Sequence, residues 1–316
     1  MSVLGWTVPP ILLRIVQIAV ALGLLAIIWS AADGPEAARA LADADIAFLA
    51  AAFAALTLQT VLSALRWRLT AAQLGIQLGP IWAIREYYMA QIINQSLPGG
   101  MIGDAGRAVR AREQAGLLAS GQAVVFERLA GQVGMFTVMA PAFFITLAMP
   151  GGVDWPSWLV VPVTALIAGL ALLPVLTLLA TRLPGAVGRK TLSFCRTTAT
   201  ALLAKEVLPR QVVLSIGTTL CNLAAFGFCA MAVGADLSLV ATLALVPLIL
   251  FTMLIPISVS GWGLREGAAS ILFPLAGAAA SQGLAASVAF GLIFLLSVLP
   301  GLIPLFLRPN ARAEKI

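Results

Sequence analysis

Long apolar segments follow one another along most of the chain and are separated by short polar stretches. A helix needs about 20 predominantly apolar residues to cross the hydrocarbon core of a bilayer. The segments that approach or exceed this length are Val8–Ala31, Ile46–Leu65, Gly121–Met149, Trp158–Thr181, Val212–Val233, Leu239–Val259 and Leu284–Leu307, with a shorter and weaker one at Leu264–Ala280. The pattern predicts an all-α integral membrane protein with about seven or eight transmembrane helices.

The composition agrees with that class. Hydrophobic residues make up 61% of the chain, charged residues only 10%, and the mean hydropathy is +1.02. A soluble domain carries about 25% charged residues. We therefore predict one polytopic membrane domain over residues 1–316, with a first half at about 8–181, a cytoplasmic loop at 182–210 and a second half at about 211–307.

The residue types present exclude several kinds of chemistry. The chain contains no histidine, so it lacks the usual general base and the commonest metal ligand. Its three cysteines, Cys195, Cys221 and Cys229, show no spacing typical of a metal site. We predict no metal site, no cofactor and no catalytic residue, and therefore a protein that is not an enzyme.

The distribution of charge predicts the orientation in the membrane. The net charge of +6 does not indicate nucleic-acid binding, because the basic residues cluster in short loops, as the positive-inside rule expects. Loop 32–45 is acidic and is placed outside, whereas loop 182–210 is basic and is placed in the cytoplasm. The N-terminus is then cytoplasmic.

Two polar stretches interrupt the apolar pattern, one in each half of the chain. They are NQSLPGGMIGDAGRAVR at 94–110 and IPISVSGWGLREGA at 255–268. The residues that break the helical pattern are Pro98, Gly99, Gly100, Gly103, Pro256, Gly261 and Gly263. Irregular backbone at membrane depth persists only inside protein or beside a water-filled cavity, and paired breaks in corresponding halves indicate a transporter's binding site. The alternative is that these residues only kink helices or end them at a surface loop.

Arginines flank the first break on both sides, at Arg66, Arg68 and Arg85 before it and at Arg107, Arg110 and Arg112 after it. One simple crossing would reverse this charge balance, so segment 80–112 is predicted to be a re-entrant hairpin. The second break, 255–268, is predicted to be a broken helix. If Leu264–Ala280 crosses, the chain has eight crossings and a cytoplasmic C-terminus. If that segment is also re-entrant, seven crossings place the C-terminal tail outside.

Polar residues surround both breaks. Tyr87, Gln91 and the Asn94–Gln95 pair recur at helical spacing, which predicts a polar face before the first break. Asp104 is predicted to cap the next helix, with Arg107 and Arg110 on one side of it. A helix N-terminus combined with guanidinium groups suits a phosphate.

A further charged pair, Glu127–Arg128, lies within an apolar helix. Ionisable residues inside a membrane usually face a cavity or the interior of a bundle. Arg128 shares a face with Gln132, while Glu127 lies with Gly131 and Gly134, small residues that permit close helix contact. The alternative is a structural ion pair that extends toward the membrane surface. The predicted substrate-binding residues are Asn94, Gln95, Asp104, Arg107, Arg110, Glu127, Arg128, Arg265 and Glu266.

The order of these motifs resembles a known family. Asn94, Leu97-Pro98-Gly99-Gly100, Gly103-Asp104 and Arg107 are followed by Glu127-Arg128 and then by Pro256, Ser260-Gly261, Gly263 and Glu266. This order is similar to that of the lysylphosphatidylglycerol synthase transmembrane family, which includes the flippase half of the bacterial multiple-peptide-resistance factor. The resemblance covers about residues 10–307, and the soluble aminoacyl-transferring domain of that factor has no counterpart here.

The resemblance implies a flippase-type transporter in the bacterial cytoplasmic membrane that moves lipids with charged or glycosylated heads between leaflets. Membrane lipids are then the expected partners, nucleic acid is not, and a homo-oligomer or a separate lipid synthase is left open. Three other functions stay open: a membrane-embedded lipid-modifying or glycosyl-transferring enzyme, a non-transporting accessory subunit of a lipid synthase, and an ion-coupled carrier of water-soluble metabolites.

Overall fold

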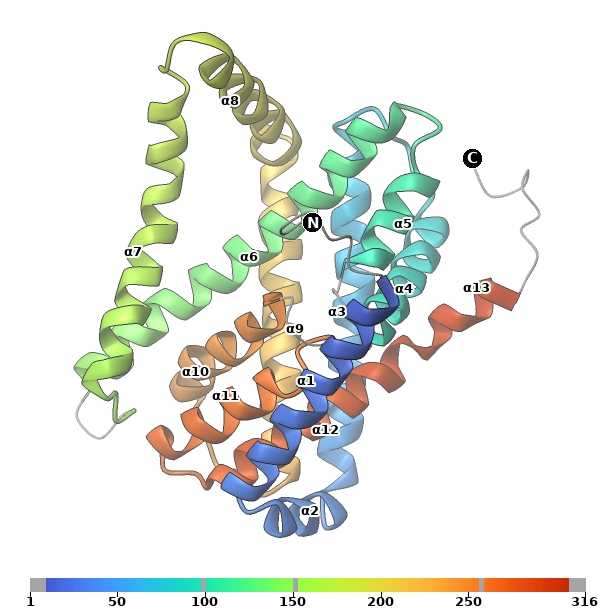
Figure 1. Cartoon of the computed structure of the whole chain (residues 1–316). Helices are drawn as coiled ribbons and strands as arrows, with labels where there is room; N and C mark the ends of the chain where they lie inside the picture. Colours follow the sequence, from blue (N-terminus) through green and yellow to red (C-terminus); the bar gives the residue numbers. More distant parts are fainter. Residues whose placement is uncertain (1–9, 98–100, 150–152, 256–258, 307–316) are drawn as a thin grey trace.

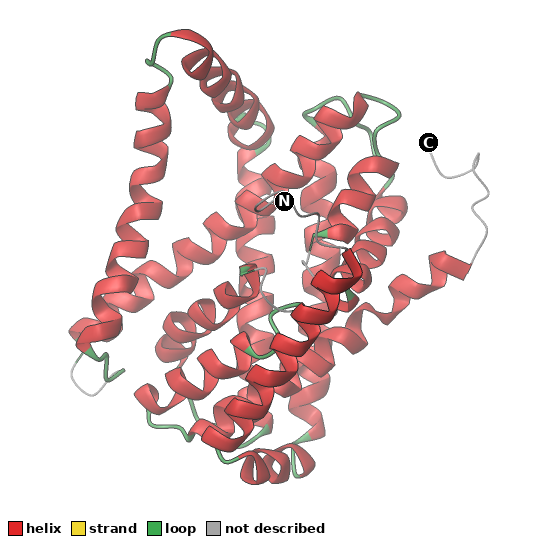
Figure 2. Cartoon of the chain, viewed as in Figure 1, coloured by secondary structure: helices red, strands yellow, loops and turns green. Residues whose placement is uncertain are grey.

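The computed structural model describes residues 10–97, 101–149, 153–255 and 259–306, and every regular element within these ranges is helical (Figures 1 and 2). The all-α class predicted from the sequence is thereby confirmed. Four of the predicted break residues, Pro98, Gly99, Gly100 and Pro256, lie outside the described residues.

The longer helices are α1 (Pro10–Ala31), α3 (Ile46–Ala72), α4 (Pro80–Ser96), α6 (Gly116–Ala148), α7 (Ser157–Ala180), α9 (Leu208–Ala232), α10 (Leu239–Phe251) and α12 (Ala280–Val298). Shorter ones are α2 (Gly34–Ala42), α5 (Ile102–Arg110), α8 (Gly185–Thr198), α11 (Leu264–Leu272) and α13 (Ile303–Phe306). Single turns extend several of these helices, among them η2 (Thr252–Leu254) after α10.

Within the described residues, five helices are long and apolar enough to cross a membrane, and a sixth span arises if the bent pair α1–α2 counts as one. The five are α3, α6, α7, α9 and α12 with its following turn. Two of the eight candidate segments therefore contain no helix that is long enough to cross the membrane by itself. Segment Leu239–Val259 is helical only to Leu254, and Leu264–Ala280 contains the nine-residue helix α11, which is only about 14 Å long at 1.5 Å per residue.

The two halves of the chain repeat one order of elements. In each half, a long helix (α3, then α9) is followed by a pair of shorter helices (α4–α5, then α10–α11) and by another long helix (α6, then α12). Helices α3 and α9 pack against each other antiparallel, since the amide of Asp45, the N-cap of α3, donates to the carbonyl of Ala232 at the end of α9, at 2.9 Å. The order and the reversed direction are those of an inverted repeat.

Helices α4 and α5 form the hairpin predicted for segment 80–112 (Figure 1). Pro80 starts α4, where its missing N–H is not needed. Leu97 has extended backbone angles, as expected for the residue before a proline. On the return arm, Gly103 lies so close to α4 that a Cβ atom there would be 2.0 Å from the carbonyl oxygen of Ala90. Glycine is therefore required for the two arms to pack.

The second break is built from left-handed backbone. Ser260, Gly261 and Gly263 have φ values of 50°, 80° and 87°. Helix α11 then restarts at Leu264, because the Glu266 carboxylate accepts a hydrogen bond from the Gly263 amide at 2.7 Å. Helices α10 and α11 pack against each other. The second break thus joins the arms of a second helical hairpin.

The two ends of the molecule carry the loops in the predicted grouping. Helix α2 and loop 32–45 lie at one end, while α8, the α3–α4 connection and the α5–α6 connection lie at the opposite end (Figure 1). The basic loop 182–210 therefore shares an end with both flanks of the first hairpin. This grouping is the one that the charge pattern predicts, and the side of the membrane on which each end lies stays a prediction.

Candidate functional site

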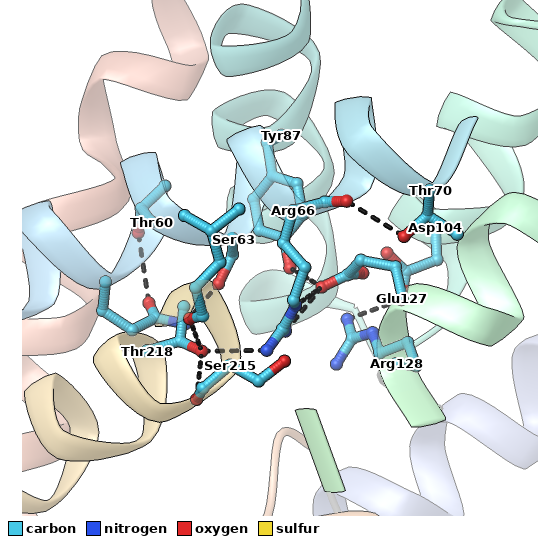
Figure 3. A network of polar contacts seen from close by, with 12 residues as sticks. Thr60, Ser63, Arg66, Thr70, Tyr87, Asp104, Glu127, Arg128, Ser215 and Thr218 are labelled. Carbon is cyan, nitrogen blue, oxygen red and sulfur yellow. Dashed lines mark hydrogen bonds and ion pairs between the residues drawn. The ribbon is translucent and has the colours of Figure 1, made fainter. Parts of the chain in front are cut away.

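A buried ionic network joins the first hairpin to the long helices α3, α6 and α9 (Figure 3). Glu127 of α6 is fully buried. Its Oε1 atom accepts hydrogen bonds from Arg66 Nη2 of α3 at 2.7 Å and from the hydroxyl of Tyr87 of α4 at 3.2 Å. Arg66 Nη1 donates in turn to Thr218 Oγ1 of α9 at 2.8 Å. One carboxylate therefore ties three helices together.

Arg107 of α5 is as fully enclosed as Glu127, with a side chain that is 0% exposed. It donates to Glu127 Oε2 at 2.8 Å and to Asp104 Oδ1 at 2.9 Å. Its guanidinium carbon lies 4.7 Å from the ring centre of Trp67 and 4.6 Å from that of Tyr87. Two carboxylates and two aromatic faces therefore hold this arginine as part of the scaffold.

Arg128 differs from the other arginines of the network because it reaches open space. Its Nη2 atom lies 2.5 Å from Asp104 Oδ2, yet 42% of its side chain is exposed. Three guanidinium groups, those of Arg66, Arg107 and Arg128, share the two carboxylates of Asp104 and Glu127. The network keeps one positive charge in excess, and the accessible part of it is Arg128.

Small residues of α6 make room for the network. A Cβ atom at Gly131 would lie 2.8 Å from Arg66 Nη2. One at Gly134 would lie 3.0 Å from the Thr219 hydroxyl and 3.1 Å from the Ser215 carbonyl oxygen, both on α9. The close helix contact predicted for these glycines is seen at Gly134, while at Gly131 the space is occupied by the Arg66 guanidinium.

A second ionic cluster joins α11 of the second hairpin to α12, and its polar groups pair with one another. Arg265 is 1% exposed and Glu266 is fully buried, and they pair at 2.6 Å. Ser287 of α12 accepts from Arg265 Nε at 2.9 Å and donates to Glu266 Oε1 at 2.9 Å. The Arg265 guanidinium also lies over the ring of Trp262, 5.1 Å from its centre. These contacts fasten α11 to α12.

A cavity of about 510 Å³ lies where the two hairpins meet, within the range typical of small-molecule sites. Its lining includes the end of the first hairpin (Asn94, Gln95 and Met101) and the end of the second (Leu254, Ile255 and Ser260). The hydroxyl of Ser260 donates to Gln95 Oε1, which joins the two ends. A smaller cavity of about 110 Å³, lined by Arg66, Tyr87 and Glu127, shares Arg128, Gln132, Met135 and Asn222 with the larger one.

The lining of the larger cavity is divided into a polar and an apolar part. The polar side chains are those of Gln91, Asn94, Gln95, Asp104, Arg128, Gln132, Asn222 and Ser260. The apolar part includes Met101, Val125, Leu129, Leu254 and Ile255, each of which is exposed. The apolar part of the lining is therefore the more accessible one, while the polar side chains are buried or half-buried.

The structure separates the residues predicted to bind a substrate into three groups. Asn94, Gln95, Asp104 and Arg128 line the large cavity, and Glu127 lines the small one. Arg110 pairs with Glu86 outside both linings, and Arg107 is enclosed. Arg265 and Glu266 belong to the second ionic cluster, so the two arginines Arg107 and Arg265 do not meet in one site.

Asp104 does not cap helix α5, contrary to the sequence-based prediction. The helix begins two residues earlier, at Ile102, and its N-cap is Met101. The early start lets Gly103 approach α4, where its amide donates to Asn94 Oδ1 at 2.8 Å. Asp104 then lies in the first turn, and its carboxylate contacts Arg107 and Arg128.

Sequence reasoning missed several members of the network. The position of Arg66 ahead of the first break predicts a cytoplasmic flanking charge, whereas α3 continues to Ala72 and buries Arg66. Trp67, Thr218 and Asn222 carried no signal of their own. The available signal is Glu127, since a carboxylate inside an apolar helix requires a cation close to it.

Among the described residues, no group of three or more Asp, Glu, Cys or His side chains is arranged to hold a metal ion. The fold is that of a polytopic helical membrane protein in which two opposed hairpins enclose a partly polar, partly apolar cavity. The chain belongs to the family described as lysylphosphatidylglycerol synthase TM region, whose sequence model matches residues 14–301. No curated protein shows a significant match to the chain.

Proposed function

We propose that this protein is a flippase-type lipid transporter, which moves a lipid with a charged head between the leaflets of the bacterial cytoplasmic membrane. The observation that carries the proposal is the divided cavity between the two hairpins. A lipid has a polar head and apolar tails, and the cavity offers Arg128 and carboxamides inside and a row of apolar side chains at the lipid-facing surface.

The family membership supports a role with lipids, since the family is named after the membrane region of a lipid synthase. The position of the polar site supports transport. It lies between hairpins that belong to opposite halves of an inverted repeat, as in transporters whose substrate site sits near the middle of the bilayer. We assign the basic end, with loop 182–210 and the N-terminus, to the cytoplasm.

The test is lipid movement in vesicles that contain only the purified protein. A fluorescent phospholipid is placed in both leaflets, and a membrane-impermeant reductant bleaches the outer leaflet, so that bleaching of the inner pool reports transfer. The intact protein should accelerate this transfer. Arg128→Gln should slow it by about tenfold or more, since hydrogen bonds to charged groups contribute about 1.5–3 kcal/mol.

Two further variants separate the cavity from the rest of the surface. Val125→Trp fills the apolar part of the cavity and should slow transfer, whereas Leu173→Trp, at an exposed position of α7 outside the cavity lining, should not. Protein that moves no lipid would contradict transport and favour an accessory subunit. Chemical conversion of the headgroup in detergent would instead favour a lipid-modifying enzyme.

A further inference from the structure

We infer that the cavity selects a lipid whose head combines one phosphate charge with neutral hydroxyl groups, and that it disfavours a cationic aminoacyl head. This inference deepens the proposed function and rests on it for the identity of the site. It concerns recognition alone, so it is tested by binding and not by transfer between leaflets.

Five carboxamides contribute to the polar part of the cavity, namely Gln91, Asn94, Gln95, Gln132 and Asn222. A carboxamide carries donors and an acceptor side by side. Hydroxyl groups on adjacent carbons are both donors and acceptors, and they match that arrangement. An apolar or purely anionic head could not form hydrogen bonds with so many paired donors and acceptors.

Several of these polar groups lack a protein partner. Within the described residues, neither the side chain of Gln132 nor that of Asn222 makes a hydrogen bond to the protein. Asn94 Nδ2 and Arg128 Nε are buried and have no hydrogen-bond acceptor in the described part of the chain. Buried donors without a partner are costly, so these atoms indicate a bound group that supplies acceptors.

The charges around the two linings favour an anion. The linings contain the guanidinium groups of Arg66 and Arg128 against two carboxylates, and the enclosed Arg107 beside them adds one positive charge in excess. The carboxylates among the lining residues are Asp104 and Glu127. Each already contacts two guanidinium groups, Asp104 those of Arg107 and Arg128, and Glu127 those of Arg66 and Arg107. A cationic head would meet the excess positive charge without a free carboxylate. A phosphate would instead pair with Arg128.

Two sources supply this chemistry: a phosphoglycerol lipid, whose head ends in free hydroxyls, and a lipid-linked sugar phosphate. The purified full chain in neutral detergent is titrated with short-chain probes. These are phosphatidylglycerol, a prenyl glucosyl phosphate, phosphatidylmethanol (equal charge, no head hydroxyl), lysyl-phosphatidylglycerol and phosphatidylcholine. Dissociation constants are measured by calorimetry.

Phosphatidylglycerol or the glucosyl phosphate should bind at least about tenfold more tightly than phosphatidylcholine and lysyl-phosphatidylglycerol, and more tightly than phosphatidylmethanol. The tighter of the two hydroxylated probes identifies the source. Asn222→Leu should remove the preference over phosphatidylmethanol, and Arg128→Gln the preference over phosphatidylcholine. Equal or tighter binding of the lysylated lipid, or equal binding of phosphatidylmethanol, would overturn the inference. Transfer activity does not enter this test, so selective binding without transfer would overturn only the proposed function.

Discussion

At the scale of single residues, the arginines of this protein divide by what surrounds them. Arg107 and Arg265 are enclosed by carboxylates and aromatic rings and leave no room for a ligand. Arg128 is held at one edge by Asp104 and is otherwise accessible. Equal charge in the sequence thus corresponds to two different environments, one enclosed and one accessible from the cavity.

Removal of the Glu127 carboxylate should destabilise the protein strongly. Glu127→Ala leaves Arg66 and Arg107 without their shared anion in a buried position, and breaking a buried ion pair costs about 3–5 kcal/mol. The measurement is thermal unfolding of the detergent-solubilised protein. Glu36→Ala is the matched control, because its pair with Arg39 is well exposed and such pairs contribute about 0–1 kcal/mol. Similar unfolding temperatures for both variants would contradict a structural role of the network.

The sequence predicts the residues of the cavity better than those of the scaffold. Asn94, Gln95, Asp104 and Arg128 stand out because polar side chains are rare in apolar helices. Arg66 could not be placed, because the length of α3 beyond its apolar run depends on packing against α4, α6 and α9. The pairing of Arg265 with Ser287 of α12 likewise depends on tertiary contacts that no local pattern encodes.

At the scale of elements, each hairpin depends on a few positions where only a small residue fits. The first hairpin was predictable, since arginines on both flanks exclude a simple crossing. The second was not, because an apolar run from 239 to 259 has the length of a span. The structure ends that helix at Leu254 and turns it through the left-handed residues Ser260 and Gly261.

Gly103→Ala should separate the arms of the first hairpin. The added methyl group would lie 2.0 Å from the Ala90 carbonyl oxygen, so the backbone must shift, and overpacking of this kind costs about 1–3 kcal/mol. Reduced thermal stability and slower lipid transfer are expected. Gly121→Ala is the control, since no atom lies within 4 Å of the added group. An unchanged Gly103→Ala protein would show that the arms do not need this contact.

At the scale of the whole molecule, the structure gives a simpler topology than the two alternatives that the sequence left open. Within the described residues there are up to six candidate spans and two hairpins, and the connections on both sides of the first hairpin lie at the same end as loop 182–210 (Figure 1). The eight- and seven-span alternatives both treated the segment 239–259 as a crossing. Hydropathy alone could not distinguish a span from one arm of a hairpin, because both are apolar.

Cysteine labelling should report this arrangement. In a variant without Cys195, Cys221 and Cys229, single cysteines are placed at the exposed positions Ala42, Ala115 and Val187. Ala115 and Val187 lie at the end with loop 182–210, so an impermeant thiol reagent should reach them only from the cytoplasm, while Ala42 should react from outside. Labelling of Ala115 from the same side as Ala42 would contradict the hairpin, and reversal of all three would contradict only the assigned orientation.

The hydrogen bond between Ser260 and Gln95 also bears on how strongly the two hairpins are held together. It joins the ends of two hairpins that belong to different halves of the chain. A hydrogen bond of this kind contributes about 0.5–1.5 kcal/mol net, which corresponds to a change of only about two- to thirteenfold in an equilibrium constant. A contact this weak is expected to break and re-form often. The two hairpin ends are therefore joined at this point by an interaction that a small competing interaction could replace.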